Sequence, residues 1–108
     1  MYKLDDIPIG AENAISRKAL AAYWNVSDRM ARRIVADLRT IEDGTDYVIV
    51  SVSRDSGYYR TQNVCEINHF LNEMRKRIRN TYKAIRAAQR IKHRLEQRAD
   101  YGGEDLAG

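Results

Sequence analysis

The stretch SRKALAAYWNVSDRMARRIVADLR, residues 16–39, decides the fold predicted for this chain. Ser16 is a favourable helix N-cap, and the apolar residues after it share one helical face: Ala19, Leu20 and Tyr23. Asn25 tolerates the left-handed backbone that a sharp turn requires. Ser27 then caps a second helix, whose buried face is expected to comprise Met30, Ala31, Ile34, Val35 and Leu38. The stretch therefore predicts two short helices joined by a tight turn, a helix-turn-helix.

The opposite side of the second helix is basic. At about 100° per residue, the side chains expected to project together from it are Arg29, Arg32, Ala36 and Arg39, with Arg33 beside them. Guanidinium groups bind phosphates or the O6 and N7 atoms of guanine. A basic helix face is often only a solvated surface, but its place after a tight turn favours DNA recognition. The expected DNA contacts are Ser27, Asp28, Arg29, Arg32, Arg33 and Arg39, with Arg17 and Lys18 in the first helix.

A β-hairpin is predicted after the helix pair. Residues 47–53 are rich in β-branched side chains, residues 54–57 supply turn residues, and residues 58–60 form the returning strand. Tyr58 and Tyr59 alternate, so one is expected in the core and the other towards solvent or DNA. Tyr23 and Trp24, at the turn between the helices, are expected to pack in the core. Before the helices, residues 7–10 are expected to be extended beside the sheet and residues 11–14 to form a short turn. This order predicts a winged helix-turn-helix, with Arg54 at the tip of the wing as a further DNA contact.

A long helix is predicted over residues 64–98. Asn63 and Glu66 resemble a capping box, and neither proline nor glycine follows until Gly102. Its apolar residues recur at alternating spacings of three and four, an imperfect heptad pattern. Residues 67–74 are expected to pack on the domain, and a second copy of the chain is the simplest partner for the exposed remainder. The dimerisation residues are expected to be Leu71, Met74, Ile78, Ile85 and Leu95.

Positive charge is concentrated in the same helix. The chain of 108 residues has a net charge of +4, but residues 64–98 contain ten basic and three acidic side chains. Such an excess of positive charge favours an anionic partner. The candidates are nucleic acid, an acidic protein and, as the weakest of the three, an anionic membrane surface. The predicted organisation is a winged helix-turn-helix domain in residues 1–62, a basic helix in residues 63–98 and a flexible acidic tail in residues 99–108. The fold class is mainly α with a small β-hairpin.

Nothing in the sequence indicates an enzyme, a cofactor or a metal site. It contains no glycine-rich phosphate loop, nucleophile elbow or dense carboxylate cluster. Cys65 and His69 are four residues apart, but a zinc site needs at least a third ligand. Cys65 is therefore expected in the core and His69 partly buried or at the surface. A single cysteine, no export signal and no membrane span together predict a cytoplasmic protein.

Three segments carry a resemblance to a known group of proteins. They are Gly10–Leu20, Val26–Arg29 and Ser56–Arg60, the last followed by the long basic helix. Together they resemble the small winged helix-turn-helix proteins of phages and prophages of Gram-positive bacteria. The chain differs from the common helix-turn-helix pattern at Asn25, where glycine is usual, and at Trp24, where a smaller apolar residue is common. The resemblance implies a phage-encoded DNA-binding protein that acts as a transcriptional regulator, an excision factor or a replication accessory factor.

The leading hypothesis is a homodimeric protein that binds specific sequences of double-stranded DNA. The second helix would enter the major groove, the wing would contact the backbone, and the long helices would pair. The alternative is a phage-encoded protein-interaction module, built on the same scaffold, that inhibits a host nucleic-acid-handling protein. RNA binding through the basic helix is a third, weaker possibility.

Overall fold

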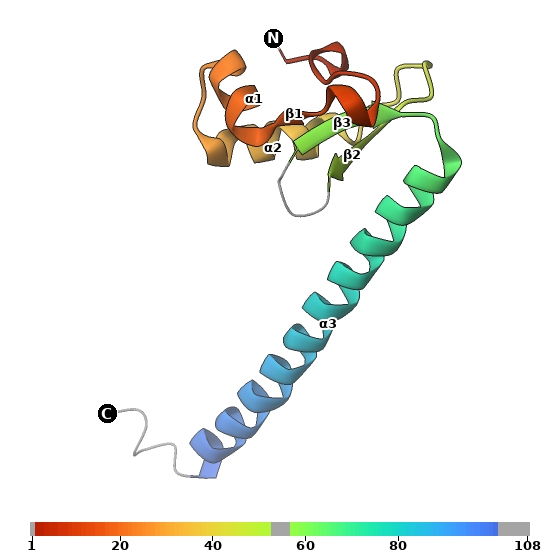
Figure 1. The fold of residues 1–108 in the computed structure, drawn as a ribbon. Coiled ribbons are helices and arrows are strands. Elements are labelled where there is room, and N and C mark those ends of the chain that lie inside the picture. The colour runs from red at the N-terminus through yellow and green to blue at the C-terminus, as the bar shows by residue number, and fades with distance from the viewer. Residues whose placement is uncertain (1, 53–56, 102–108) are drawn as a thin grey trace. The chain divides into compact units, whose positions relative to one another are not determined.

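The computed structural model describes residues 2–52 and 57–101 and is mainly helical, with a small antiparallel sheet and a long C-terminal helix (Figure 1). It divides into two compact units, residues 1–71 and residues 72–108, so the first unit includes the start of the long helix. The elements in chain order are η1 (Leu4–Asp6), η2 (Ala11–Asn13), β1 (Ile15–Ser16), α1 (Arg17–Trp24), α2 (Asp28–Leu38), β2 (Val48–Val52), β3 (Gly57–Thr61) and α3 (Val64–Tyr101).

Local capping defines the helix pair, as the sequence predicted. The Ser16 hydroxyl accepts a hydrogen bond from the Ala19 amide at 3.0 Å, and the Ser27 hydroxyl accepts one from the Met30 amide at 3.1 Å. Between the helices, Asn25 adopts the left-handed conformation, with φ 55° and ψ 50°. Its amide closes α1 against the Ala22 carbonyl at 3.1 Å. The tight turn between α1 and α2 is therefore confirmed.

The sheet has a strand that sequence inspection missed. The predicted hairpin is present as β2 and β3, but β1 also pairs with β3, with Ile15 opposite Tyr58, in the order β1-β3-β2 (Figure 1). The extended segment before η2 lies beside the same strand, as expected, through a parallel bridge between Ile9 and Arg60. β3 is the central strand of the sheet, and all five of its residues are buried. The prediction that Tyr58 or Tyr59 faces solvent is therefore wrong.

The core lies between the helix pair and the sheet. Ile7, Leu20, Val35 and Ile49 are its fully buried large side chains, and Trp24 packs against its edge as expected. In α2 the buried residues are those predicted, except Met30, which is 43% exposed. In α1 the buried pair is Leu20 and Ala21, whereas Ala19 and Tyr23 are exposed, contrary to expectation. The buried face of this short helix is centred between Leu20 and Ala21, and Ala19 and Tyr23 lie too far around the helix to be covered.

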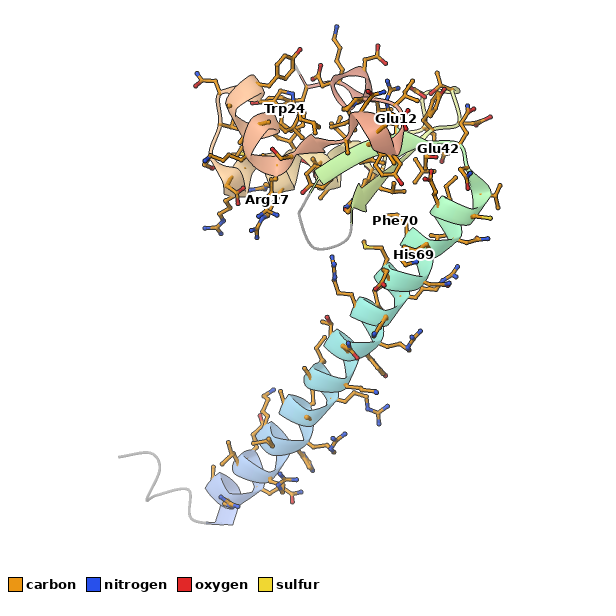
Figure 2. The ribbon with its side chains drawn as sticks, in the orientation of Figure 1. Glu12, Arg17, Trp24, Glu42, His69 and Phe70 are labelled. Carbon is orange, nitrogen blue, oxygen red and sulfur yellow. The ribbon has the colours of Figure 1, made fainter. Side chains whose placement is uncertain are left out.

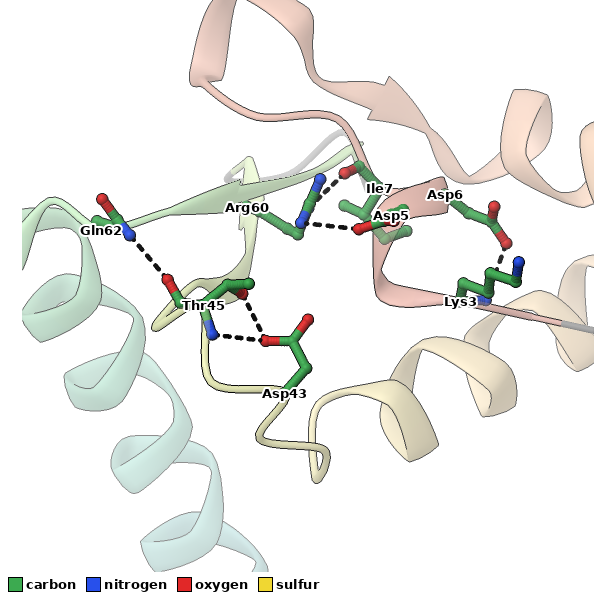
Figure 3. A network of polar contacts seen from close by, with 8 residues as sticks. All are labelled: Lys3, Asp5, Asp6, Ile7, Asp43, Thr45, Arg60 and Gln62. Atoms are coloured by element: carbon green, nitrogen blue, oxygen red, sulfur yellow. Dashed lines mark hydrogen bonds and ion pairs between the residues drawn. The ribbon is translucent and has the colours of Figure 1, made fainter.

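Arg60, a buried residue of β3, links the N-terminal segment to the sheet (Figure 3). Its side chain is buried, and its Nε donates a hydrogen bond to the Ile7 carbonyl at 2.7 Å. Its Nη1 lies 3.5 Å from an Asp5 carboxylate oxygen, and its guanidinium stacks 5.2 Å from the centroid of the Tyr47 ring. The backbone amide of Arg60 also donates to the Pro8 carbonyl at 2.7 Å. One residue of β3 therefore holds the extended lead-in by both its backbone and its side chain.

The long helix begins where the sequence predicted. The Asn63 side chain accepts a hydrogen bond from the Glu66 amide at 3.1 Å, whereas the Glu66 carboxylate accepts one from the Thr61 hydroxyl at 2.5 Å. The helix continues to Tyr101, three residues beyond the predicted end, and residues 102–108 of the predicted tail lie outside the described residues. Cys65 is exposed, so its predicted place in the core is wrong. No helix in the described part of the chain is both long enough and apolar enough to cross a membrane.

Candidate nucleic-acid interface

The face of α2 opposite the core is exposed and basic. The buried residues of α2 lie within one half of its circumference, and Arg29, Arg33 and Ala36 lie on the other half. Arg29, Arg33 and Ala36 are all exposed, as is Arg32 to one side. Within the described residues, Arg29 and Arg33 form no hydrogen bond, ion pair or ring contact. Within the described residues, two free guanidinium groups therefore lie near a small side chain on an open helix surface.

Asp28 ties the start of α2 to the start of α1. Arg17 Nε donates a hydrogen bond to Asp28 Oδ1 at 2.6 Å, and Arg32 Nη2 lies 3.4 Å from Asp28 Oδ2 (Arg17 is labelled in Figure 2). The hydrogen bond to Asp28 raises the pKa of the Arg17 guanidinium above its ordinary value. One carboxylate thus links both helices, and it leaves Arg17 and Arg32 less free to meet an anion than Arg29 and Arg33.

Arg39 was predicted to project from the exposed basic face of α2, but it is partly buried. Its Nε donates to the Ile49 carbonyl at 3.1 Å, and its Nη2 donates to the Ser51 hydroxyl at 2.8 Å. The guanidinium lies 4.8 Å from the centroid of the Phe70 ring and 5.7 Å from that of Tyr58. Arg39 therefore joins the end of α2 to β2 and to the start of α3. Helical periodicity places Arg39 one turn after the buried Val35, beside the buried face of α2, but it does not identify the partners of the guanidinium on β2.

The remaining predicted DNA contacts are placed differently. Lys18 is exposed near the start of α1, and Ser27 is exposed with its hydroxyl engaged in the cap of α2. Arg54 lies outside the described residues, so the tip of the predicted wing has no structural description here. The structure thus brings together four of the predicted residues at the start of α2: Arg17, Ser27, Asp28 and Arg32. Arg29 and Arg33 lie on the neighbouring exposed face of the same helix.

The predicted dimerisation residues follow one another along α3. Leu71 is half-buried within the first unit. In the second unit, Ile78, Ile85 and Leu95 are 64%, 48% and 52% exposed. Three large apolar side chains on one stretch of helix are therefore about half exposed or more in the described part of the second unit.

Cys65 and His69 lie near the start of α3. Both are exposed, and His69 is labelled on the first turns of α3 in Figure 2. Within residues 2–52 and 57–101, no group of three or more histidine, cysteine, aspartate or glutamate side chains is arranged to hold a metal ion.

Comparison with known proteins gives no match for this chain among protein-family models, curated proteins or solved structures.

Proposed function

We propose that this chain is a sequence-specific double-stranded DNA-binding protein of a phage or mobile element, with α2 as the helix that enters the major groove. The observation that carries the proposal is that Arg29 and Arg33 are exposed near Ala36 on the side of α2 opposite the core, and that neither guanidinium has a partner among the described residues. A major groove about 12 Å wide accepts a helix, and arginine is the side chain that most often reads guanine there. Ala36 lets the helix backbone approach the groove closely.

The support around α2 suits this role, because a reading helix must be held rigidly. The Arg17–Asp28 contact fixes its beginning, and Arg39 fixes its end against β2. Arg29 and Arg33 would then contact base edges. Lys18 would contact phosphate, as would Arg54 if the hairpin serves as a wing. A regulator of transcription, an excision factor and a replication accessory factor would all use this interface.

The test begins with selection of bound duplexes from a random-sequence library. Anisotropy titrations with a selected and a scrambled duplex then compare the wild type with Arg29→Ala and Arg33→Ala. Each substitution should reduce the preference for the selected duplex by about 1–3 kcal/mol, the value of one arginine–guanine contact. Lys3→Ala is the control, since it removes one exposed positive charge from a segment outside α2. An unchanged preference in both arginine variants would rule out α2 as the reading helix.

We also propose that two copies of the chain pair through α3. The exposed apolar side chains of Ile78, Ile85 and Leu95 recur at heptad spacing, and a lone helix leaves such a seam in water. Pairing would cover the seam and present two α2 helices to two half-sites on DNA, separated by whole helical turns.

Analytical ultracentrifugation tests the pairing with matched charge insertions. Ile85→Glu places a carboxylate in the seam and should shift the protein to monomer, whereas Asn80→Glu places one at an exposed position outside the seam. A wild-type monomer at tens of micromolar, or equal behaviour of the two variants, would contradict the pairing. If the wild type shows no preference among DNA sequences and co-purifies with a host nucleic-acid-handling protein, the chain is instead a protein-interaction module that engages this protein through the winged-helix scaffold and the basic helix.

A further inference from the structure

A row of basic side chains runs along α3 within the second unit. We call it the basic row, and it consists of Arg75, Arg79, Lys83, Arg86, Arg90 and Arg94. Each member follows the one before it by three or four residues, so all six lie on one side of the helix. Every member is exposed. At about 1.5 Å of rise per residue, the row is about 28 Å long.

The described carboxylates of α3 form no ion pair with the basic row. Among the described residues, only Arg86 of the row has a side-chain partner, Tyr82, whose hydroxyl lies 3.5 Å from Arg86 Nη1. Glu96 pairs with Lys92 at 3.6 Å, away from the row. Like charges three or four residues apart destabilise a helix. An anion bound along the row would therefore relieve repulsion along most of its length.

The side chains that share this side of the helix indicate which anion fits. Between residues 72 and 98, the sector of about 100° that the row spans also contains Asn72, Lys76, His93 and Gln97, and no apolar residue. Protein interfaces depend on a dry centre of aromatic and aliphatic side chains. Nucleic-acid interfaces are polar and strongly positive. The composition of this sector thus favours a nucleic acid over an acidic protein.

The row is also separate from the seam proposed for pairing. Ile78 and Ile85 lie about a third of a turn around the helix from the centre of the row. A second copy on the seam would leave the row open to a further ligand. Five of the six members are arginine, whose planar guanidinium can donate two hydrogen bonds to one phosphate.

We propose that the basic row binds the phosphodiester backbone of duplex DNA without regard to sequence, as a second contact surface that is independent of α2. It would add the same affinity to every duplex, whereas α2 would distinguish among them. The row can act in this way whether or not α2 reads bases, so the two proposals can fail separately.

The experiment measures the salt dependence of binding by the full chain to a fluorescent duplex of random sequence. The row variant combines Arg79→Gln, Lys83→Gln and Arg90→Gln. The matched control combines Arg77→Gln, Lys92→Gln and Arg98→Gln, which removes the same charge from the same helix outside the row. Each phosphate contact contributes about 0.9 to the slope of log K against log salt, so the row variant should lose roughly 2–3 from the slope. The control should lose less than about 1.

Two results would overturn this proposal. Equal slopes for the row variant and the control would mean that net charge alone attracts DNA. An unchanged slope in the row variant would mean that the row does not touch phosphate, and an acidic protein would then be the fitting partner. Circular dichroism and sedimentation of each variant confirm that helix content and pairing are preserved. Arg29→Ala and Arg33→Ala should change the preference between duplexes and leave the row's share of the slope intact, which separates this outcome from failure of the α2 assignment.

Discussion

Apart from the exposed arginines of α2, arginine has different surroundings in the two units of this chain. In the first unit, Arg17 contacts a carboxylate of α2, Arg39 contacts β2, and Arg60 contacts the carbonyl of Ile7 in the N-terminal segment. In the second unit, most arginines of the basic row point into solvent without a partner among the described residues. A count of positive charge treats these side chains alike. Their neighbours show that the first group stabilises the fold, whereas the second is available to a ligand.

The largest expected difference between the units comes from shortening one apolar side chain in each. Leu20→Ala opens a cavity at a fully buried position and should lower the free energy of unfolding of the first unit by about 3–5 kcal/mol. Ile85→Ala shortens a half-exposed side chain and should leave that free energy within about 0.5 kcal/mol of the wild type. Fluorescence of Trp24 during urea denaturation reports on the first unit. A large effect of Ile85→Ala on this signal would show that the units do not unfold separately.

A smaller difference is expected for the same arginine substitution in each unit. Arg60→Met leaves the Ile7 carbonyl without its buried donor and should cost about 1–3 kcal/mol of stability, measured by the same denaturation. Arg79→Met removes an exposed guanidinium from the basic row and should change stability by less than about 0.5 kcal/mol. Comparable losses would contradict the distinction between structural and available arginines.

A third comparison replaces one asparagine by alanine in each unit. Asn25→Ala forces alanine into the left-handed conformation at the turn and should destabilise the first unit by about 1 kcal/mol. Asn80→Ala places a better helix former at an exposed position of α3 and should raise its helix content slightly. Thermal denaturation followed by circular dichroism measures both, and a neutral Asn25→Ala would mean that the turn tolerates other geometries.

The smallest expected effect is a loss of stability of the first unit at alkaline pH. Burial raises the pKa of the Tyr59 phenol above its ordinary value, and the nearby Glu66 carboxylate adds to the shift. The unfolded state therefore loses this proton first, so the stability of the first unit should fall as pH rises above about 10. Tyr59→Phe should weaken that fall, while Tyr82→Phe removes the same hydroxyl from an exposed ring and serves as the control. Identical alkaline profiles for wild type and Tyr59→Phe would exclude Tyr59 as a cause.

Prediction from sequence succeeded where the signal is local. The caps at Ser16 and Ser27, the left-handed Asn25 and the start of α3 all depend on residues within a few positions of one another. The hairpin was predictable for the same reason, since its strands adjoin in sequence.

The errors arose where distant segments meet. Strand β1 has only two residues, and nothing near them indicates that β3 will pair with them. The alternation of Tyr58 and Tyr59 predicted one open face of β3 and gave no sign that segments outside the hairpin would cover it, so the burial of Tyr59 was missed. Arg60 could not be assigned to the interior, because its acceptor lies 53 residues earlier in the chain. Of the candidate interface, the exposure of Arg29 and Arg33 followed from helical periodicity, but the contacts of Arg39 depended on where β2 lies.

The pairing of β1 with β3 bears on the order in which the chain folds during synthesis. The contacts within the α1–α2 pair are local and can form as soon as residue 38 has left the ribosome. Ile9 and Ile15 have no strand to join until residues 58–60 have emerged. We therefore expect the nascent chain to hold a helical hairpin with a loose N-terminal arm, and protease protection of that arm should begin only in ribosome-bound chains that extend well past residue 61.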